Sequence, residues 1–377
     1  MLRALLAAYT AALYGLILVL TRGSSQLDSG TDYYTDSQGE TTGSLADPFT
    51  GQLGVSVSTI YDIDLSSSSF YLEGYTWMKW KTVPDWLKEY DEEVYQCPVK
   101  SINFINAVDR QDLQVRLEPS SPVQDDDQQM IQWLSFSGKF VASKLDLRLF
   151  PFEVITLPVE IELDDFYAGE ADITYISSGP ILTTSATING YNLRNISVRP
   201  CHHIYTTNWG FEYSKGYFGR DNYTEFIAFV VATVFKRDPW NSFLNIFLPL
   251  LIVMAVVLAA PLVAIQDYQT KLAIPASALL VLVFLQDSYK KILPPGLNYP
   301  TLADLVYIYN MYITIIVFIW SLFQTKTYLN AEAIGLAADQ AHIAGSLDNA
   351  FFMVTLLFFV ASPLIFYEIC KSRVAKE

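Results

Sequence analysis

Three stretches of 19 to 22 residues near the C-terminal end carry no charged side chain, and this feature constrains the fold most. They are residues 243–264, 305–323 and 349–367. A helix needs about 20 apolar residues to cross a hydrocarbon core about 30 Å thick. A fourth stretch, residues 272–286, is shorter and richer in alanine and serine. One such stretch is also typical of a buried helix in a soluble domain, but four in succession predict a membrane domain over residues 241–370.

The acidic side chains are concentrated ahead of these stretches. Residues 22–240 carry 31 acidic and 16 basic side chains, whereas the rest of the chain carries eight of each. The whole net charge of −15 therefore belongs to the N-terminal part. A nucleic-acid-binding protein needs a basic face to contact phosphates, so this balance argues against a nucleic-acid partner.

The N-terminal end has the pattern of a secretory signal. Residues 1–21 are mostly apolar after a single Arg3, and they predict a signal peptide over residues 1–22, with a fifth spanning helix as the alternative because no good cleavage motif follows. Residues 23–50 are rich in serine, threonine and glycine and predict a flexible leader. We expect the N-terminal domain and the tail 371–377 to lie outside the plasma membrane. The three basic residues of that tail run against the positive-inside rule.

Residues 51–240 alternate apolar and polar side chains, as half-buried strands do. The segment 157–163, for example, places aliphatic side chains on one face and Glu160 and Glu162 on the other. Turn dipeptides separate it from similar segments at residues 55–65, 70–81 and 223–237. Many short strands separated by turns predict an antiparallel, immunoglobulin-like sandwich of about ten strands.

Few residues of this part suit catalysis or metal binding. Oxidising conditions would allow a disulfide between Cys97 and Cys201, and two free thiols are equally compatible with the sequence. We find no metal-ligand spacing, no glycine-rich phosphate loop and no nucleophile motif in the sequence. We therefore expect no enzymatic activity, no cofactor and no metal site.

The segment 267–291 carries a mixed face. Steps of three and four residues keep side chains on one face of a helix. The series that follows this rule runs from small and polar, through bulky and apolar, to charged: Gln269, Ala273, Ser277, Leu280, Phe284, Asp287 and Lys291. Five copies around an axis would stack these residues as rings, and Leu280 and Phe284 would form an apolar gate that closes by dewetting. A packing helix that turns the same stripe toward its neighbours is the alternative.

Pro275 complicates the start of this helix. Proline is tolerated in the first turn but removes a hydrogen bond and kinks a helix further along. The helix therefore begins near residues 272–274 or bends at Pro275, and the sequence leaves both alternatives open.

Charged residues around this segment bear on ion preference. Asp287 is the only acidic residue on the mixed face, and Asp267 lies just beyond its inner end. Together with the acidic N-terminal part, which would concentrate cations, they favour permeation of monovalent cations. Lys271, Lys290 and Lys291 act in the opposite direction, so anion selectivity is the alternative.

Residues 143–157 contain the most specific motif, in which Leu145-Asp146-Leu147 is followed by Phe150-Pro151-Phe152-Glu153. This segment resembles the signature loop of the pentameric ligand-gated ion channels, the Cys-loop receptor superfamily. Ser143 and Leu157 occupy the positions of the two cysteines that normally flank the loop. The namesake disulfide is therefore absent, which resembles the prokaryotic branch.

The resemblance extends from about residue 52 to residue 370. It includes the strand that contains Trp80, Lys236-Arg237 before the first apolar stretch, Pro249 within it, and Ile292-Leu293-Pro294 after the second. It implies a homopentamer in contact with membrane lipids and places Leu280 at the gate. It also implies a coupling region at the membrane surface, where Arg237 would pair with Asp146 or Glu153. The other coupling residues implied are Phe150, Pro151, Phe152, Leu293 and Pro294.

The resemblance further implies an agonist site between neighbouring subunits, lined by Tyr75, Phe104, Phe166, Tyr167, Trp209, Phe211, Tyr213 and Tyr217. An aromatic cage suits an ammonium group, through a cation–π attraction of about 1–2 kcal/mol, and Glu162, Asp164 and Asp165 would add negative charge. A role in the sandwich core is the alternative for part of this set. His202 and His203 leave protons open as the stimulus, but adjacent strand residues point to opposite faces and argue against a shared metal ion.

The sequence as a whole predicts a ligand-gated, cation-selective channel. The rival prediction is a non-conducting membrane sensor or adhesion protein with a β-sandwich ectodomain.

Overall fold

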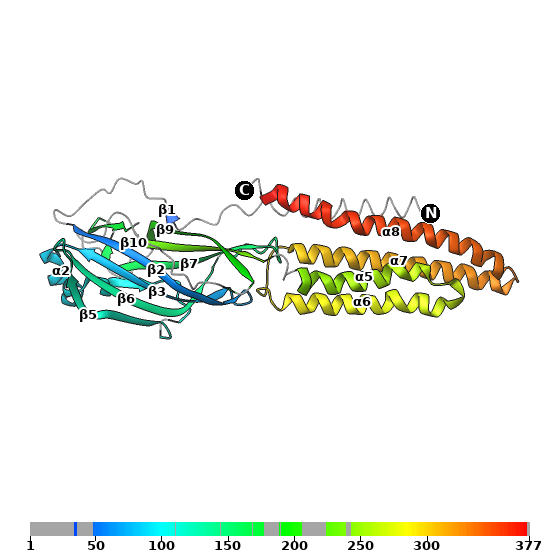
Figure 1. Cartoon of the computed structure of the whole chain (residues 1–377), viewed down its shortest axis with the longest axis horizontal. Coiled ribbons are helices and arrows are strands. Elements are labelled where there is room, and N and C mark those ends of the chain that lie inside the picture. The colour runs from blue at the N-terminus through cyan, green and yellow to red at the C-terminus, as the bar shows by residue number, and fades with distance from the viewer. Residues whose placement is uncertain are drawn as a thin grey trace.

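The computed structural model places a β domain at one end of a long molecule and a helical domain at the other (Figure 1). The predicted signal peptide (residues 1–22) and most of the predicted leader lie outside the described residues. The structure describes residues 34–35, 48–109, 111–143, 145–167, 169–176, 188, 190–205, 224–238 and 243–374.

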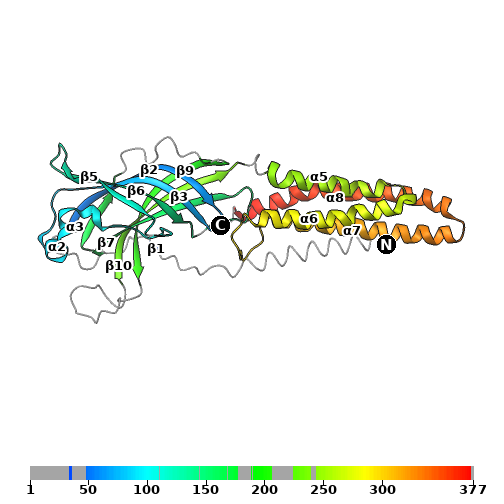
Figure 2. The same ribbon diagram turned by 90° about the horizontal axis from the view of Figure 1, so that it is seen from below.

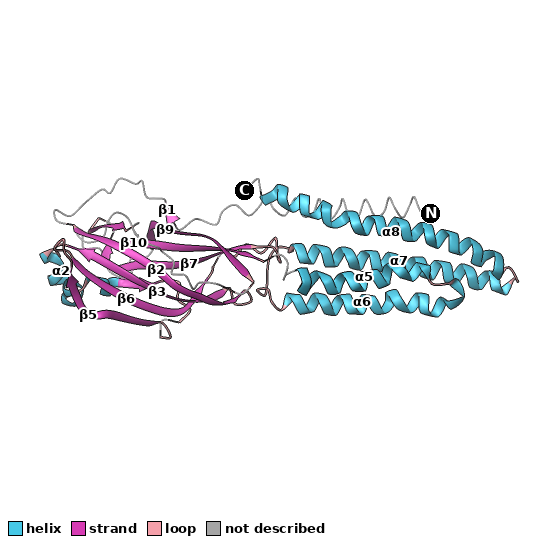
Figure 3. Cartoon of the chain, in the orientation of Figure 1, coloured by secondary structure: helices cyan, strands magenta, loops and turns pink. Residues whose placement is uncertain are grey.

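The strands of the β domain, drawn in magenta in Figure 3, pair into two five-stranded sheets. One sheet has the order β1-β9-β10-β7-β4 and the other β5-β6-β3-β2-β8. The two short helices α2 (Asp85–Tyr90) and α3 (Glu92–Gln96) lie in the connection between β3 and β4. The strands are β1 (Tyr34–Thr35), β2 (Phe49–Asp64), β3 (Ser69–Trp80), β4 (Ile102–Phe104), β5 (Gln114–Gln124), β6 (Met130–Val141), β7 (Val154–Tyr167), β8 (Ala171–Tyr175), β9 (Tyr191–Tyr205) and β10 (Thr224–Arg237).

Alternation in the sequence explains why these segments form strands. In β7, Val159, Ile161 and Leu163 are buried on the face that meets the other sheet. Aromatic rings close the core between the sheets. Phe49 of β2 stacks on Phe166 of β7, with ring centroids 4.9 Å apart. The prediction of a β-rich domain with strands in two layers is confirmed.

The two cysteines of the β domain are separate thiols. Cys97 and Cys201 are both buried and are not bonded to each other. The structure therefore agrees with the second of the two alternatives that the sequence left open.

Four helices that are long and apolar enough to cross a membrane follow the β domain. The first span, Leu244–Leu262, consists of α5 (Leu248–Ala259) with the short helical turns on either side of it, and the others are built on α6 (Tyr268–Lys290), α7 (Leu302–Ala333) and α8 (Ala337–Val374). Both views place them side by side along the long axis (Figures 1 and 2). The prediction of four membrane-capable helices is confirmed.

α6, α7 and α8 are longer than the uncharged stretches that predict them. The segment 324–348, between the third and fourth uncharged stretches, is mostly helix: α7 continues to Ala333, α8 begins at Ala337, and only three residues join them. Charged and polar side chains end an apolar run in the sequence, but they do not end a helix whose backbone hydrogen bonds continue.

The second of these helices also begins earlier than one of our alternatives allowed. α6 starts at Tyr268 and passes through Pro275, so a start near residues 272–274 is wrong. Pro275 lies in the second turn, with its ring buried on the packing face. Its missing N–H leaves one carbonyl of the first turn without a helical donor.

Candidate functional site

The mixed face of α6 points away from the other helices. The residues that α6 buries are Lys271, Pro275, Ala278, Leu282 and Tyr289, which repeat every three or four residues and form one packing stripe. The predicted pore residues lie on the nearly opposite face, and all seven are exposed: Gln269, Ala273, Ser277, Leu280, Phe284, Asp287 and Lys291. Leu280 is 60% exposed and Phe284 64%. Within one chain, the alternative in which this stripe packs against neighbouring helices is therefore wrong.

Polar groups on this face make contact with lipid unfavourable. Gln269 and Ser277 are both exposed, and the Ser277 hydroxyl donates to the Ala273 carbonyl of its own helix at 2.9 Å. Polar and charged residues of membrane segments normally face a bundle interior or water rather than lipid. The arrangement suits a surface that lines water.

Charged residues at the C-terminal end of α6, nearest the β domain, are paired. Asp287 and Lys291 form an ion pair of 2.9 Å on the exposed face, and Lys290 lies 3.4 Å from Asp304 of α7. Because Asp287 and Lys291 are both well exposed, this end of α6 presents one negative and one positive charge side by side. The pairing agrees with the expectation that Lys291 acts against the negative charge of Asp287.

A buried ion pair joins the β domain to the chain entering the helices. Arg237 Nη1, at the end of β10, lies 2.9 Å from Glu153 Oε1, and the Glu153 side chain is fully buried. Tyr191 donates its hydroxyl to the same oxygen at 2.9 Å. Burial, with the charge of Glu153 adding to it, raises the pKa of Tyr191, so its hydroxyl stays protonated. The guanidinium also lies over the Phe150 ring, 5.1 Å from its centroid.

The structure decides between the two partners expected for Arg237. Asp146 pairs with Arg148 of its own loop at 2.8 Å, and Arg237 pairs with Glu153. The expectation of a pair with Asp146 is wrong, because Asp146 stays at the surface while Glu153 turns inward beside the end of β10.

The loop 146–153 also provides acceptors for the start of α7. The Leu302 N–H donates to the Arg148 carbonyl at 2.8 Å, and the Ala303 N–H donates to the Phe150 carbonyl at 3.1 Å. The first N–H groups of a helix have no partner within the helix, so the loop satisfies donors that would otherwise be unpaired. The hydroxyl oxygen of Tyr299, in the link between α6 and α7, accepts a hydrogen bond from the Leu147 N–H at 3.1 Å.

Aromatic stacking continues this contact into the helices. Phe150 stacks on Tyr289 of α6 with centroids 6.3 Å apart, and Phe152 stacks on Phe247 ahead of α5 at 5.8 Å. Pro151 and Leu293 are buried nearby, and Pro294 is half-buried. The loop therefore contacts three of the four helical segments, and movement of the loop must disturb them.

The predicted ligand-contacting aromatics separate into two groups in the structure. Phe104 and Phe166 are almost completely buried between the sheets, where Phe104 packs on Phe136 at 4.5 Å. Their assignment to a ligand-binding cage is wrong, because an aromatic ring that is buried in the core cannot contact a ligand. Tyr75 is 42% exposed, and Tyr167 lies against Phe226 at 5.0 Å. The other predicted contacts lie outside the described residues: Trp209, Phe211, Tyr213 and Tyr217.

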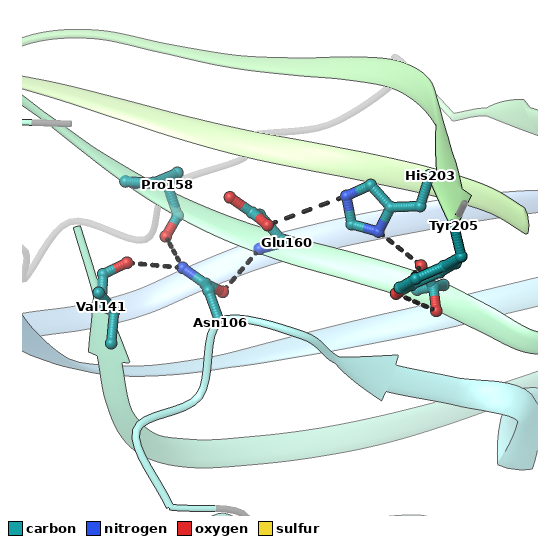
Figure 4. A network of polar contacts seen from close by, with 7 residues as sticks. Asn106, Val141, Pro158, Glu160, His203 and Tyr205 are labelled. Atoms are coloured by element: carbon teal, nitrogen blue, oxygen red, sulfur yellow. Dashed lines mark hydrogen bonds and ion pairs between the residues drawn. The ribbon is translucent and has the colours of Figure 1, made fainter. Parts of the chain in front are cut away.

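A polar network crosses the sheet β9-β10-β7 (Figure 4). His203 Nδ1 lies 2.5 Å from Glu162 Oε2, and the Tyr205 hydroxyl donates to the same carboxylate at 3.0 Å. His203 Nε2 lies 3.9 Å from Glu160. The central strand allows this crossing because Ala228, opposite Glu162, has a small side chain.

Asn106 ties this network to the loop after β4. Its amide nitrogen donates to the carbonyls of Val141 at 2.9 Å and Pro158 at 2.7 Å, and its oxygen accepts the Glu160 N–H at 3.0 Å (Figure 4). Glu162 is itself buried, so the face that the sequence assigns to solvent is covered at this point. The result is a negatively charged, aromatic-rich region on the outer side of the sheet.

Asp164 gives this region a pH dependence. Partial burial, with repulsion from Glu162 and Asp165 adding to it, raises the pKa of Asp164 from 3.8 to about 6, although the Asn103 amide opposes the shift at 2.7 Å. The folded state therefore binds this proton more tightly than the unfolded chain does. Asp164 then contributes most stability below about pH 4, and that contribution is lost as the pH rises through about 6.

We expect Asp164→Asn, which mimics the protonated acid, to raise the unfolding temperature most at about pH 7.5, with a gain that shrinks steadily toward pH 4. Thermal unfolding of the solubilised protein across this pH range measures the difference. Asp172→Asn, at an exposed position on β8, is the matched control. An equal gain from Asp164→Asn at every pH would contradict the assignment.

Sequence reasoning missed several residues of these contacts. Phe226, Tyr289 and Tyr299 carry no signal beyond their aromatic character. Lys271 and Asp348, which form an ion pair inside the helical domain, do carry one, because each is an isolated charge at the edge of an apolar stretch, and such charges need partners inside a membrane domain.

No protein-family model matches the chain, and its sequence has no significant match among curated proteins. The fold and these contacts define a membrane protein with a β-rich domain, four membrane-capable helices and a dense contact region between the two.

Proposed function

We propose that the protein is a pentameric, ligand-gated ion channel of the plasma membrane, with its N-terminal domain outside the cell. The observation that carries this proposal is the exposed, mixed face of α6, which lies opposite its packing stripe. A membrane helix that buries one face and presents glutamine, serine and a charged pair on the other needs water or other copies of itself there. Five copies around an axis satisfy that need.

Rings of Leu280 and Phe284 then form the gate. Both side chains are large, apolar and more than half exposed in one chain. Below them, Ala273 and Ser277 leave a wider, polar passage. An apolar constriction between polar segments stops ions by dewetting, and a small outward movement of the helices restores conduction.

The conformational effect of agonist binding in the β domain is transmitted to the gate through the loop 146–153. This loop holds Arg237 through Glu153 and accepts hydrogen bonds from the first N–H groups of α7. The region around Tyr167, Tyr205 and Phe226 combines aromatic rings with the carboxylates of Glu162 and Asp164. Rings and negative charge together suit a cationic amine, so we propose this ligand class, with protons as the alternative stimulus.

Voltage clamp of oocytes tests the proposal. We expect wild-type protein at the cell surface to carry current when perfused with primary amines, amino acids or acid steps. In a NaCl dilution gradient the reversal potential should move toward the sodium equilibrium potential. Surface-expressed protein without current under any of these conditions would overturn the channel proposal and favour a non-conducting sensor or adhesion protein. A shift toward the chloride potential would overturn cation selectivity alone.

A further inference from the structure

A charged cluster lies inside the helical domain, at the end of the bundle away from the β domain (Figure 1). The fully buried ammonium of Lys271 forms an ion pair with Asp348. It also donates hydrogen bonds to the carbonyls of Pro261 at 3.1 Å and Val263 at 3.3 Å. The other carboxylate oxygen of Asp348 accepts a hydrogen bond from Trp320 Nε1 at 2.8 Å.

All four helices meet in this cluster. Pro261 and Val263 follow the C-terminal end of α5, Lys271 belongs to the first turn of α6, Trp320 to α7 and Asp348 to α8. Pro261 lies in the 3-10 turn Ala260–Leu262 that continues α5, and Val263 comes directly after it, so the ammonium satisfies backbone carbonyls just beyond α5 as well as Asp348. The Trp320 ring also stacks on Phe351 of α8, 4.6 Å away and nearly parallel, which keeps its N–H directed at Asp348.

A buried ion pair is not explained by stability alone. Burying two charges costs the free energy of their hydration, and the attraction between them often does no more than offset that cost. Two apolar side chains of similar volume in their place would give the same or greater stability. Ionisable residues inside membrane segments are rare and mark functional sites. The cluster therefore calls for a role that an apolar pair could not perform.

The charge balance along α6 indicates that role. Asp267 is exposed immediately before α6 and forms no ion pair with another residue in the part of the chain that the structure describes. Lys271, one turn further on, is the nearest cation in sequence, and Asp348 holds it on the packing stripe, away from the exposed face. At the outer end, Asp287 and Lys291 compensate each other. Asp267 is thus the uncompensated charge beside this helix.

We propose that Asp348 is a selectivity-determining positioning residue. By holding the Lys271 ammonium inside the helix bundle, it leaves the carboxylates of Asp267 to set a negative potential at the inner end of the pore. This inference rests on the proposed channel function. It assigns part of the ion preference to a helix that does not line the pore.

The test is the Na⁺/Cl⁻ permeability ratio of Asp348→Asn, from reversal potentials in a NaCl dilution gradient. Without its carboxylate partner, the ammonium on its flexible stem moves toward water at the inner mouth. We expect the ratio to fall by about threefold or more, because five cations then oppose five anions. Glu332→Gln, which removes an exposed carboxylate at the same end of the molecule, is the matched control and should leave the ratio nearly unchanged.

The double variant Lys271→Gln/Asp348→Asn keeps the proposal testable if the single variant fails to reach the surface. Neutral amides replace both charges, so we expect the wild-type ratio within about twofold. A clear rise in cation preference in this double variant would overturn the inference, because it would mean that permeating ions already sense Lys271. An unchanged ratio in Asp348→Asn would overturn this inference alone, whereas a wild-type protein without current would overturn the channel proposal with it.

Discussion

Leu280→Ala is expected to open the channel in the absence of agonist. In the proposed pentamer, the substitution shortens five apolar side chains at the narrowest ring, so the dewetted state of the pore loses apolar surface on every subunit. Each shortened side chain removes on the order of 1–2 kcal/mol of the hydrophobic free energy that stabilises the dewetted, closed state. We therefore expect the fraction of channels that are open at rest to rise by about tenfold or more. The measurement is agonist-free current per surface-expressed molecule in voltage-clamped oocytes. Because it needs no agonist, this result does not depend on the identity of the ligand.

Leu357→Ala is the matched control for this prediction. Leu357 lies on α8, is 70% exposed, and loses the same atoms, but it does not belong to the mixed face of α6. We expect its resting current to equal that of the wild type. Equal currents in Leu280→Ala and wild type, at equal surface expression, would contradict the placement of Leu280 at the gate.

Arg237→Ala is expected to abolish agonist-evoked current. The substitution leaves the fully buried carboxylate of Glu153 without its ion-pair partner, and an uncompensated buried charge costs roughly 3–5 kcal/mol. The loop 146–153 would lose its tie to the end of β10, although it would keep its hydrogen bonds to α7. Surface labelling together with agonist-evoked current measures the outcome, since the loss can fall on assembly, on opening or on both.

Two further variants separate the charge pair from general damage to the loop. Arg148→Ala removes the partner of Asp146 in the same loop, where both side chains are about half exposed, and an exposed pair contributes at most about 1 kcal/mol. We expect near-normal current from it. Arg237→Ala/Glu153→Gln removes both charges, and we expect it to recover surface expression in part. Normal current in Arg237→Ala would remove the coupling role.

Much of the site can be read from periodicity. The alternation of β7 and the three- and four-residue steps of α6 assign side chains to faces without any knowledge of their neighbours. The face predicted to line a pore is the exposed face of α6. It carries the polar and charged residues of the helix, so the opposite stripe packs against the other helices. Lys271 fits that stripe only because Asp348 neutralises it.

Other residues cannot be placed from the sequence, because local pattern does not distinguish their environments. Phe104 and Tyr75 are both aromatic residues on strands, yet one is closed between the sheets and the other is exposed. Asp146 and Glu153 belong to the same loop, and only the docking of that loop beside the end of β10 selects Glu153 for Arg237. Lys271 and Asp348 are 77 residues apart, and the sequence around either residue does not indicate that the other is its partner.

The sequence by itself determined the β-rich domain, the four membrane-capable helices and which residues of α6 share a face. Each of these follows from the length or the periodicity of the hydrophobic pattern, which acts within one element and needs no partner. Only the tertiary structure decided which charges pair, which aromatics enter the core, and how the loop 146–153 contacts the helices. Those outcomes depend on which elements approach one another, and burial then forces each charge and each polar group to find a partner at that contact.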